Sequence, residues 1–309
     1  MGEYTVQIET NAISRPRGGA ARAVALFLEE TRPCVQVVFL MRFLAGAALA
    51  AGGRSAGLGP WVVVPAASWA LAALFAYGIN GVSDVAEDRV NRTGRPIARG
   101  ELSRRAAARL TWLSAAGSVA LAVLSRDVLL LGYVLGFLLL GYAYSAGPFT
   151  LKRSAAGTSG TVLAMGLLTY AAGWTAAGAA RPTGPGLVLA VGMSLWMCVV
   201  GAVTKDFSHA RGDAAAGRRT SVTAWGDLAA RRVGAVGALA VAAGFAAAAG
   251  PWPVLLGPAA LVLLGGAVAV AVLCAATRPD AAPGRTPYRA FMVTQHLAHG
   301  VLFAGLVLL

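Results

Sequence analysis

The sequence contains few charged residues and very few acids. Only 13% of its 309 residues are charged, and Asp and Glu together number 13, whereas a soluble domain usually carries about 25% charged residues. Cysteine is scarce as well, and Cys34, Cys198 and Cys274 show no CxxC or metal-binding spacing. The composition therefore argues against a soluble domain and predicts that the cysteines are small buried apolar residues.

Long apolar runs take the place of the missing charge. Hydrophobic residues make up 57% of the chain, and its 39 glycines suit close packing between membrane helices. A helix that crosses a bilayer needs roughly 20 mostly apolar residues, and its backbone polar groups are bonded within the helix. We therefore predict an all-α, polytopic membrane bundle of about nine transmembrane helices. The apolar segments are 34–53, 60–82, 107–124, 128–147, 157–179, 185–207, 232–250, 253–275 and 290–308.

Lys and Arg are distributed unevenly among the connections between these segments. The connections after the second, fourth, sixth and eighth segments hold most of them, whereas the alternate connections contain only Arg54, Arg126 and Arg181. Since the basic side of a membrane protein faces the cytoplasm, we expect an inner-membrane protein whose C-terminus lies outside. Residues 1–22 lack the apolar core of a cleavable signal peptide, and residues 1–30 are predicted to form a cytoplasmic tail.

The net charge of +13 is largely explained by this asymmetry. The sequence contains no basic patch with interleaved aromatic residues, so we expect no nucleic acid partner. Nothing in it indicates an obligatory protein partner. The partners expected from composition are membrane lipid and an anionic substrate.

A stripe of oxygen-bearing side chains ends the second apolar segment. Asn80, Asp84 and Asp88 recur every four residues, so on a continuous helix they share one face. Such oxygens are the ligands that Mg²⁺ prefers, and without a cation the two carboxylates would repel each other. Ionisable residues that emerge from an apolar helix usually mark a functional site. The alternative is a solvated helix end with incidental acids.

A second acidic stripe ends the sixth segment. Asp206 and Asp213 are seven residues apart, which places both on one helix face, with His209 between them. Two facing acidic stripes can hold two or three Mg²⁺ ions, and those ions can bind a diphosphate. The alternative is an exposed loop of mixed charge.

The fourth segment ends in a cationic pair. Tyr144-Ser145 is followed by a Gly-Pro break and then by Lys152 and Arg153. Lys and Arg bind phosphate by charge and by geometry. The alternative for this pair is a cytoplasmic charge without any ligand.

These three motifs together resemble the UbiA superfamily of intramembrane prenyltransferases. The family pattern NxxxDxxxD is matched by Asn80, Asp84 and Asp88. In the second motif, His209 stands where the family usually has Asp, and a neutral imidazole is a poor Mg²⁺ ligand. The alternative roles for His209 are a hydrogen-bond donor to phosphate and a base. The other matches are Thr31-Arg32-Pro33, Arg89, Asn91, Arg95-Pro96, Tyr144, Ser145, Pro148, Leu151, Lys152, Arg153, Lys205, Asp206, Gly212, Asp213, Gly217 and Thr220.

The resemblance implies that residues 31–309 form helices around a central cavity, with a cytoplasmic cap built from the motif connections. It implies Mg²⁺ as the cofactor and a polyprenyl diphosphate as the substrate. The implied metal ligands are Asn80, Asp84, Asp88, Asp206 and Asp213, of which the three residues Asp84, Asp206 and Asp213 are the expected catalytic groups. The implied diphosphate-binding residues are Lys152, Arg153, Arg95, Tyr144 and Lys205.

The nucleophile remains open at this stage. In a prenyltransferase it is a small-molecule acceptor, expected to be aromatic, and Arg32 and Arg42 are candidates to hold its acid group. For Arg42, ten residues into an apolar run, the alternative is a side chain that snorkels to the interface. In a terpene cyclase of the UbiA type, the nucleophile is an alkene of the same prenyl chain. A transporter is a third alternative, disfavoured because the acids cluster at one membrane face.

Overall fold

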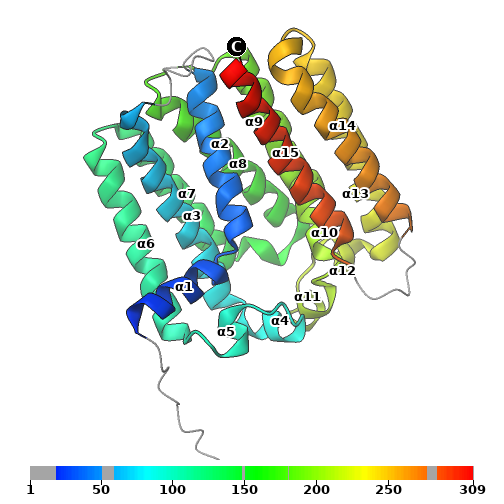
Figure 1. Cartoon of the computed structure of the whole chain (residues 1–309). Coiled ribbons are helices and arrows are strands. Elements are labelled where there is room, and N and C mark those ends of the chain that lie inside the picture. The colour runs from blue at the N-terminus through cyan, green and yellow to red at the C-terminus, as the bar shows by residue number, and fades with distance from the viewer. Residues whose placement is uncertain (1–18, 51–58, 148–149, 180, 277–283, 309) are drawn as a thin grey trace, which may run out of the picture.

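The structure is a computed structural model that describes residues 19–50, 59–147, 150–179, 181–276 and 284–308. Over these residues the chain is helical and contains no β-strand. Figure 1 shows long helices side by side, with short helices gathered at one end. The long helices are α2 (Pro33–Ala50), α3 (Val63–Ser83), α6 (Arg104–Leu124), α7 (Val128–Ser145), α8 (Ala155–Ala176), α9 (Gly184–Leu195), α13 (Asp227–Ala249), α14 (Pro253–Ala276) and α15 (Thr286–Leu308).

The predicted membrane bundle is confirmed. Within the described residues, eight helical spans are long and apolar enough to cross a bilayer, one of which runs from α9 through the π-helical turn η4 (Trp196–Gly201) into α10 (Ala202–Asp206). Helix α8 completes the bundle and packs against α2, α7 and α9. It is richer in Gly and Thr than the others, and Thr161 and Thr169 donate to carbonyls of their own helix at 2.7 Å. These two hydroxyl groups are therefore satisfied within their own helix.

Helices α2 and α8 approach each other closely because glycine lies at two of their contacts. A Cβ on Gly46 would come within 2.5 Å of the Tyr170 carbonyl oxygen. A Cβ on Gly173 would come within 2.0 Å of the Phe43 carbonyl oxygen. Small residues at such positions allow dense packing between membrane helices, which brings the two backbones into contact here.

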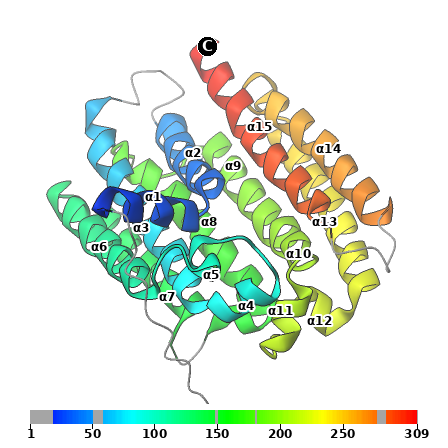
Figure 2. The ribbon, with the colours of Figure 1, turned by 60° about the horizontal axis from the view of Figure 1, so that its bottom comes forward.

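Five short helices form a cap at one end of the bundle (Figure 2). Helix α1 belongs to the segment predicted as a tail, but it is folded against α3, α5 and α6, and Glu30 at its end is only 1% exposed. Residues 1–18 of that tail lie outside the described residues. The C-terminal end of α15 lies at the opposite end of the bundle (Figure 1). The cap helices are α1 (Ala20–Glu30), α4 (Val85–Val90), α5 (Pro96–Arg99), α11 (Ala210–Ala215) and α12 (Ser221–Trp225).

Neither acidic stripe lies on a continuous helix, so that expectation is wrong. Helix α3 ends at Ser83 and α4 begins at Val85, with Asp84 at the junction. Likewise α10 ends at Asp206, and three residues separate it from the start of α11 at Ala210. At both junctions the chain passes from a bundle helix into the cap, and the acids are therefore distributed over two elements in each motif.

Candidate functional site

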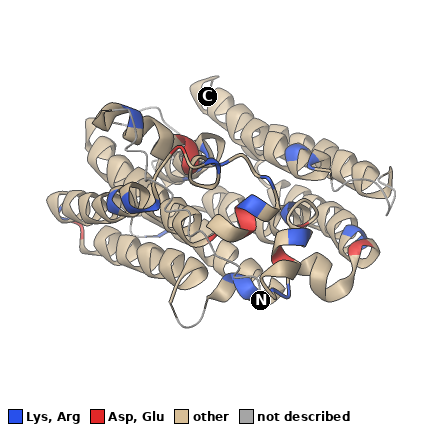
Figure 3. Ribbon diagram, turned by 90° about the horizontal axis from the view of Figure 1, so that it is seen from below, with Lys and Arg blue, Asp and Glu red and all other residues tan. Residues whose placement is uncertain are grey.

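A cavity at the cap end of the bundle collects most of the predicted site residues. The predicted residues that line it are Arg32, Asn80, Asp84, Asp88, Arg95, Tyr144, Lys152, Lys205, His209 and Asp213. Its remaining walls include apolar side chains farther along the long helices, among them Phe39, Met165 and Phe291. Charged residues surround this end of the molecule when it is seen from below (Figure 3). The cavity thus has a charged mouth and an apolar depth.

Arg95 holds the first acidic motif to helix α1. Its Nη1 lies 3.0 Å from Asp88 Oδ2, and its Nε lies 2.7 Å from Glu30 Oε1. The Glu30 carboxylate also accepts a hydrogen bond from the Ile97 backbone at 2.9 Å. Burial raises the pKa of Glu30 despite the neighbouring guanidinium. Glu30 was not among the predicted site residues, because from sequence it was placed at the end of a tail.

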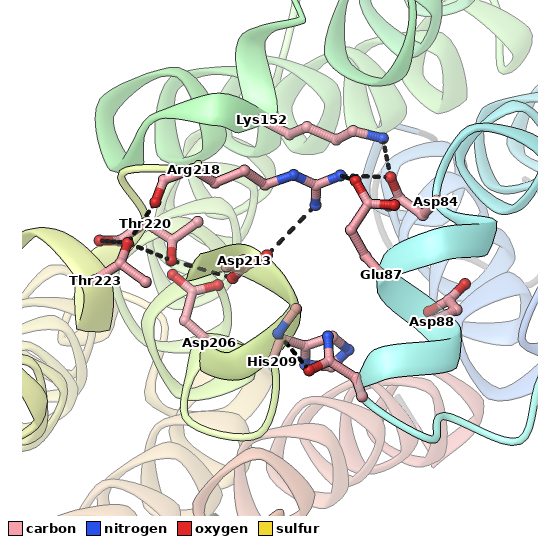
Figure 4. Close-up of polar contacts among 12 residues, drawn as sticks. Asp84, Glu87, Asp88, Lys152, Asp206, His209, Asp213, Arg218, Thr220 and Thr223 are labelled. Carbon is pink, nitrogen blue, oxygen red and sulfur yellow. Dashed lines mark hydrogen bonds and ion pairs between the residues drawn. The ribbon is translucent and has the colours of Figure 1, made fainter. Parts of the chain in front are cut away.

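The two acidic motifs meet at one arginine (Figure 4). Lys152 Nζ and Arg218 Nη2 both lie 2.6 Å from Asp84 Oδ1. Arg218 Nη2 also lies 2.7 Å from Glu87 Oε1, and its Nη1 lies 3.4 Å from Asp213 Oδ1. Asp84 and Asp213 therefore share one guanidinium. Sequence reasoning missed Arg218 and Glu87, since Arg218 was counted only as a cytoplasmic charge.

The local charges act differently on the two bridged acids. Burial alone would raise the pKa of Asp84, but Lys152 and Arg218 hold it below its usual value. For Asp213, burial outweighs the nearby cations and raises the pKa. Asp84 is therefore the more strongly stabilised carboxylate of the pair.

Asp206 is buried and is not among the residues that line the cavity. Its Oδ2 accepts hydrogen bonds from Ser221 N at 3.0 Å and from Ser221 Oγ at 2.8 Å, which fixes the start of α12. Its Oδ1 is buried without a hydrogen bond, 3.6 Å from Lys205 Nζ. One carboxylate oxygen in this motif thus lacks a close partner.

His209 has a defined tautomer. Its Nδ1 lies 2.9 Å from the Lys205 carbonyl oxygen, which can only accept, so Nδ1 carries the proton. Its Nε2 is buried without a hydrogen-bond partner, and the residue lines the cavity. Burial, together with Lys205 and Arg32, lowers the pKa of His209 to about 3. In the neutral ring, Nε2 is therefore the nitrogen that can accept a hydrogen bond, and it has no partner among the described residues.

Besides Asp206, two further predicted site residues do not line the cavity. Arg153 is exposed on the short helix η3 (Leu151–Arg153). Arg42 is fully buried, and its Nη2 donates to the Met193 carbonyl at 3.2 Å and to Gln295 Oε1 at 3.0 Å. The snorkelling alternative for Arg42 is therefore wrong. Pro148 of the Tyr144–Arg153 motif lies outside the described residues.

The donor atoms at the mouth are suitable for a hard cation. No group of three His, Cys, Asp or Glu side chains forms a ready metal site within the described residues. However, the carboxylates of Asp84, Asp88 and Asp213 line one cavity, and Asp206 contributes an oxygen without a hydrogen bond. Oxygen donors of this kind are those that Mg²⁺ takes in proteins. The residues present therefore fit Mg²⁺ chemistry better than that of a sulfur- or nitrogen-bound metal.

Comparison with known proteins agrees with this geometry. The sequence profile of the UbiA prenyltransferase family matches residues 39–298. No curated protein sequence matches the chain.

Several solved structures share the fold. A UbiA homolog from Archaeoglobus fulgidus bound to DMAPP and Mg²⁺ is 18% identical, with a TM-score of 0.65 over 92% of this chain and 99% of that one. A UbiA homolog from Aeropyrum pernix K1 is 20% identical, with a TM-score of 0.59 over 88% and 96% of the two chains. A structure described for digeranylgeranylglyceryl phosphate synthase is 14% identical, with a TM-score of 0.57 over 93% and 98%.

Proposed function

Because this chain belongs to the UbiA prenyltransferase family, we propose that it is a Mg²⁺-dependent intramembrane prenyltransferase. It cleaves a polyprenyl diphosphate and transfers the prenyl group to a small-molecule acceptor, which we expect to be aromatic. The observation that carries this proposal is the cavity itself, in which carboxylates and cations line the mouth and apolar side chains line the depth. A diphosphate fits the charged end, and a prenyl chain fits the apolar end.

The metal would be held by oxygen donors on both acidic motifs. These are Asn80, Asp84, Asp88, Asp206 and Asp213, with Asp206 contributing through the oxygen that lacks a hydrogen bond. Bound Mg²⁺ supplies Lewis-acid stabilisation of the diphosphate as a leaving group. The Archaeoglobus fulgidus homolog bound to DMAPP and Mg²⁺ supports Mg²⁺ as the cofactor.

Cations at the mouth stabilise the leaving group. When the bond between the prenyl carbon and the bridging oxygen breaks, its electron pair stays on the diphosphate. Lys152, Arg95 and Lys205 line the cavity and are placed to neutralise that charge. Tyr144 lines the same cavity and can donate a hydrogen bond to a phosphate oxygen. Arg153 is left out of the proposal because its side chain is exposed.

The allylic cation that remains reacts in a water-poor part of the cavity. Side chains such as Phe39 and Met165 surround it and limit premature hydrolysis. Arg32 lines the same cavity and is the candidate to hold the acid group of an acceptor. Arg42 no longer fits that role, because it does not line the cavity and its Nη2 already donates to two protein acceptors. From the charge asymmetry of the connections, we place the cap on the cytoplasmic side of a cell inner membrane.

Product analysis tests the proposal. Purified protein is incubated with geranyl to geranylfarnesyl diphosphates, with and without aromatic acids, in Mg²⁺ or in EDTA. Mg²⁺-dependent release of diphosphate together with a prenylated acid supports the transferase. Cyclic hydrocarbons or terpene alcohols formed without an acceptor would instead identify a cyclase. If no prenyl diphosphate is cleaved in the presence of Mg²⁺, both activities are ruled out.

A further inference from the structure

A single guanidinium lies between the two acidic motifs. Arg218 contacts Asp84 and Glu87 from the first motif at 2.6 and 2.7 Å, and Asp213 from the second motif at 3.4 Å. Its side chain is only 11% exposed, and it lines the cavity. Figure 4 shows the Arg218 side chain between Asp84 and Glu87 on one side and Asp213 on the other. One positive charge thus serves three carboxylates from both halves of the site.

This arrangement gives Arg218 the electrostatic role that a metal ion would otherwise have. Three partly buried carboxylates at close range repel one another unless a cation lies between them. Lys152 assists at Asp84, but only Arg218 among the described residues contacts both Asp84 and Asp213. A Mg²⁺ ion that binds the same oxygens would be repelled by the guanidinium. Arg218 and the metal therefore compete for these carboxylates.

The Arg218 backbone is held independently of its side chain. Its N–H donates to the Asp213 carbonyl at 2.8 Å, and its carbonyl accepts from Thr223 Oγ1 at 2.7 Å. The long side chain can therefore turn about its own torsions while the cap stays in place. The acceptor that enters with the metal is the diphosphate, whose oxygens suit a guanidinium in bidentate geometry.

We propose that the Arg218 guanidinium takes the place of the metal between the carboxylates when neither metal nor substrate is bound. When both are bound, the guanidinium binds the diphosphate instead. Without substrate, it holds the two acidic motifs together. When metal and diphosphate arrive, the metal takes the carboxylates and the guanidinium transfers to the phosphate oxygens. This rests on the proposed function, in which both motifs bind metal.

Metal binding without substrate tests the exchange directly. Mn²⁺ is titrated into detergent-purified wild type, Arg218→Gln and Arg219→Gln, and free Mn²⁺ is followed by electron paramagnetic resonance. Arg219→Gln removes the same charge from an exposed neighbour. Removing a competing charge beside the ligands should tighten Mn²⁺ binding by Arg218→Gln about tenfold, whereas Arg219→Gln should match wild type. Added inorganic pyrophosphate should tighten Mn²⁺ binding strongly in wild type and weakly in Arg218→Gln.

Thermal unfolding provides a second measurement. In EDTA, Arg218→Gln should unfold at a lower temperature than wild type, because its carboxylates have lost their shared cation. Mn²⁺ should restore most of that difference, and its effect on wild type should be smaller. If Arg218→Gln does not fold in EDTA, Arg218→Lys keeps a charge with fewer contacts and should bind Mn²⁺ more tightly than wild type.

The outcomes separate the two proposals. The proposed role of Arg218 would be overturned if Arg218→Gln bound Mn²⁺ no more tightly than Arg219→Gln. It would also be overturned if no variant bound Mn²⁺. If the predicted order of affinities holds but no prenyl diphosphate is cleaved, the proposed function falls and the role of Arg218 remains.

Discussion

Two regions of this molecule that hold buried cations differ in the partners of those cations. At the cavity mouth, Lys152 and Arg218 both contact the Asp84 carboxylate. In the middle of the bundle, Arg42 is completely buried, and the acceptors that it contacts among the described residues are neutral, such as the Met193 carbonyl and Gln295. A charge paired with an opposite charge can exchange that partner for a substrate or a metal. A charge such as that of Arg42, which in the described part of the chain is hydrogen-bonded only to neutral groups, has no charged partner that a substrate or a metal could replace.

Hydrogen bonds link several buried side chains in the central region. Gln295 Oε1 accepts from Arg42, while its carbonyl accepts from His299 Nδ1 at 2.7 Å. His299 Nε2 in turn lies 2.7 Å from the Tyr170 hydroxyl. These contacts join α2, α8 and α15 inside the bundle. The comparison implies that changes at the mouth reduce activity, whereas changes in the centre reduce stability.

The largest effect is expected from Asp84→Asn. This change removes the carboxylate that Lys152 and Arg218 share and that would bind metal. We expect the rate of diphosphate release to fall by about 10²–10³-fold, as when a charge-stabilising group is removed from an active site. The rate is measured with a phosphate-release assay at saturating Mg²⁺.

Glu101→Gln is the matched control for Asp84→Asn. Glu101 also carries a carboxylate in the cap, but it is exposed and pairs with Arg99 at the surface. Its activity should match wild type. Activity of Asp84→Asn within a few-fold of wild type would remove this residue from the proposed site.

An intermediate effect is expected from His209→Asp. This change places an anion where a neutral ring now lines the cavity, near Lys205 and Arg32. A nearby anion stabilises a bound cation, so half-saturation should need about tenfold less Mg²⁺. His209→Asn is the control, because it changes the side chain to a similar size as Asp without adding a charge. An unchanged Mg²⁺ requirement in His209→Asp would show that the ring lies too far from the metal to influence it.

The membrane helices could be predicted because each one is specified by the residues of its own segment. A run of roughly 20 apolar residues specifies a membrane helix with no knowledge of its neighbours, and observed helices such as α6 and α9 begin within a few residues of the predicted segments. The motif spacing also placed Asp84 and Asp213 at one membrane face, where the structure has them sharing Arg218. Periodicity alone could not show that the helices break at Asp84 and after Asp206.

The missed features depend on contacts between distant parts of the chain. Arg218 lies 134 residues from Asp84, and Glu30 lies 67 residues from Ile97. From sequence, an arginine in a basic connection cannot be told from any other cytoplasmic charge. Likewise, a glutamate at the end of a tail gives no sign that it will be buried. Only the fold reveals which charges are paired.

A smaller effect is expected where the cap packs on the bundle. A Cβ on Gly81 would lie 2.3 Å from Glu30 Oε1 and 2.8 Å from Arg95 Nη2. Gly81→Ala must therefore shift this ion pair, and with it the Arg95 guanidinium that lines the cavity. A small displacement of the Arg95 guanidinium weakens its contact with the reacting substrate, so we expect kcat/KM for the prenyl diphosphate to fall by about threefold.

Gly132→Ala is the control for Gly81→Ala, because a Cβ at Gly132 meets nothing within 4 Å. Ala favours a helix over Gly, so this variant should keep its activity and be at least as stable as wild type. Equal kcat/KM in the two variants would show that the position of Arg95 does not limit substrate binding.

The smallest effect on turnover is expected from Tyr170→Phe in the central network. His299 Nδ1 donates to the Gln295 carbonyl, so Nε2 is an acceptor. Among the described residues, only the Tyr170 hydroxyl donates a hydrogen bond to it. Leaving it unsatisfied should lower the free energy of unfolding by about 1–3 kcal/mol, measured by denaturation in detergent. Tyr133→Phe, which removes a half-buried hydroxyl on α7, should change stability much less. Because Tyr170 does not line the cavity, kcat/KM should match wild type, and a large loss of activity would show that the bundle centre and the mouth are coupled.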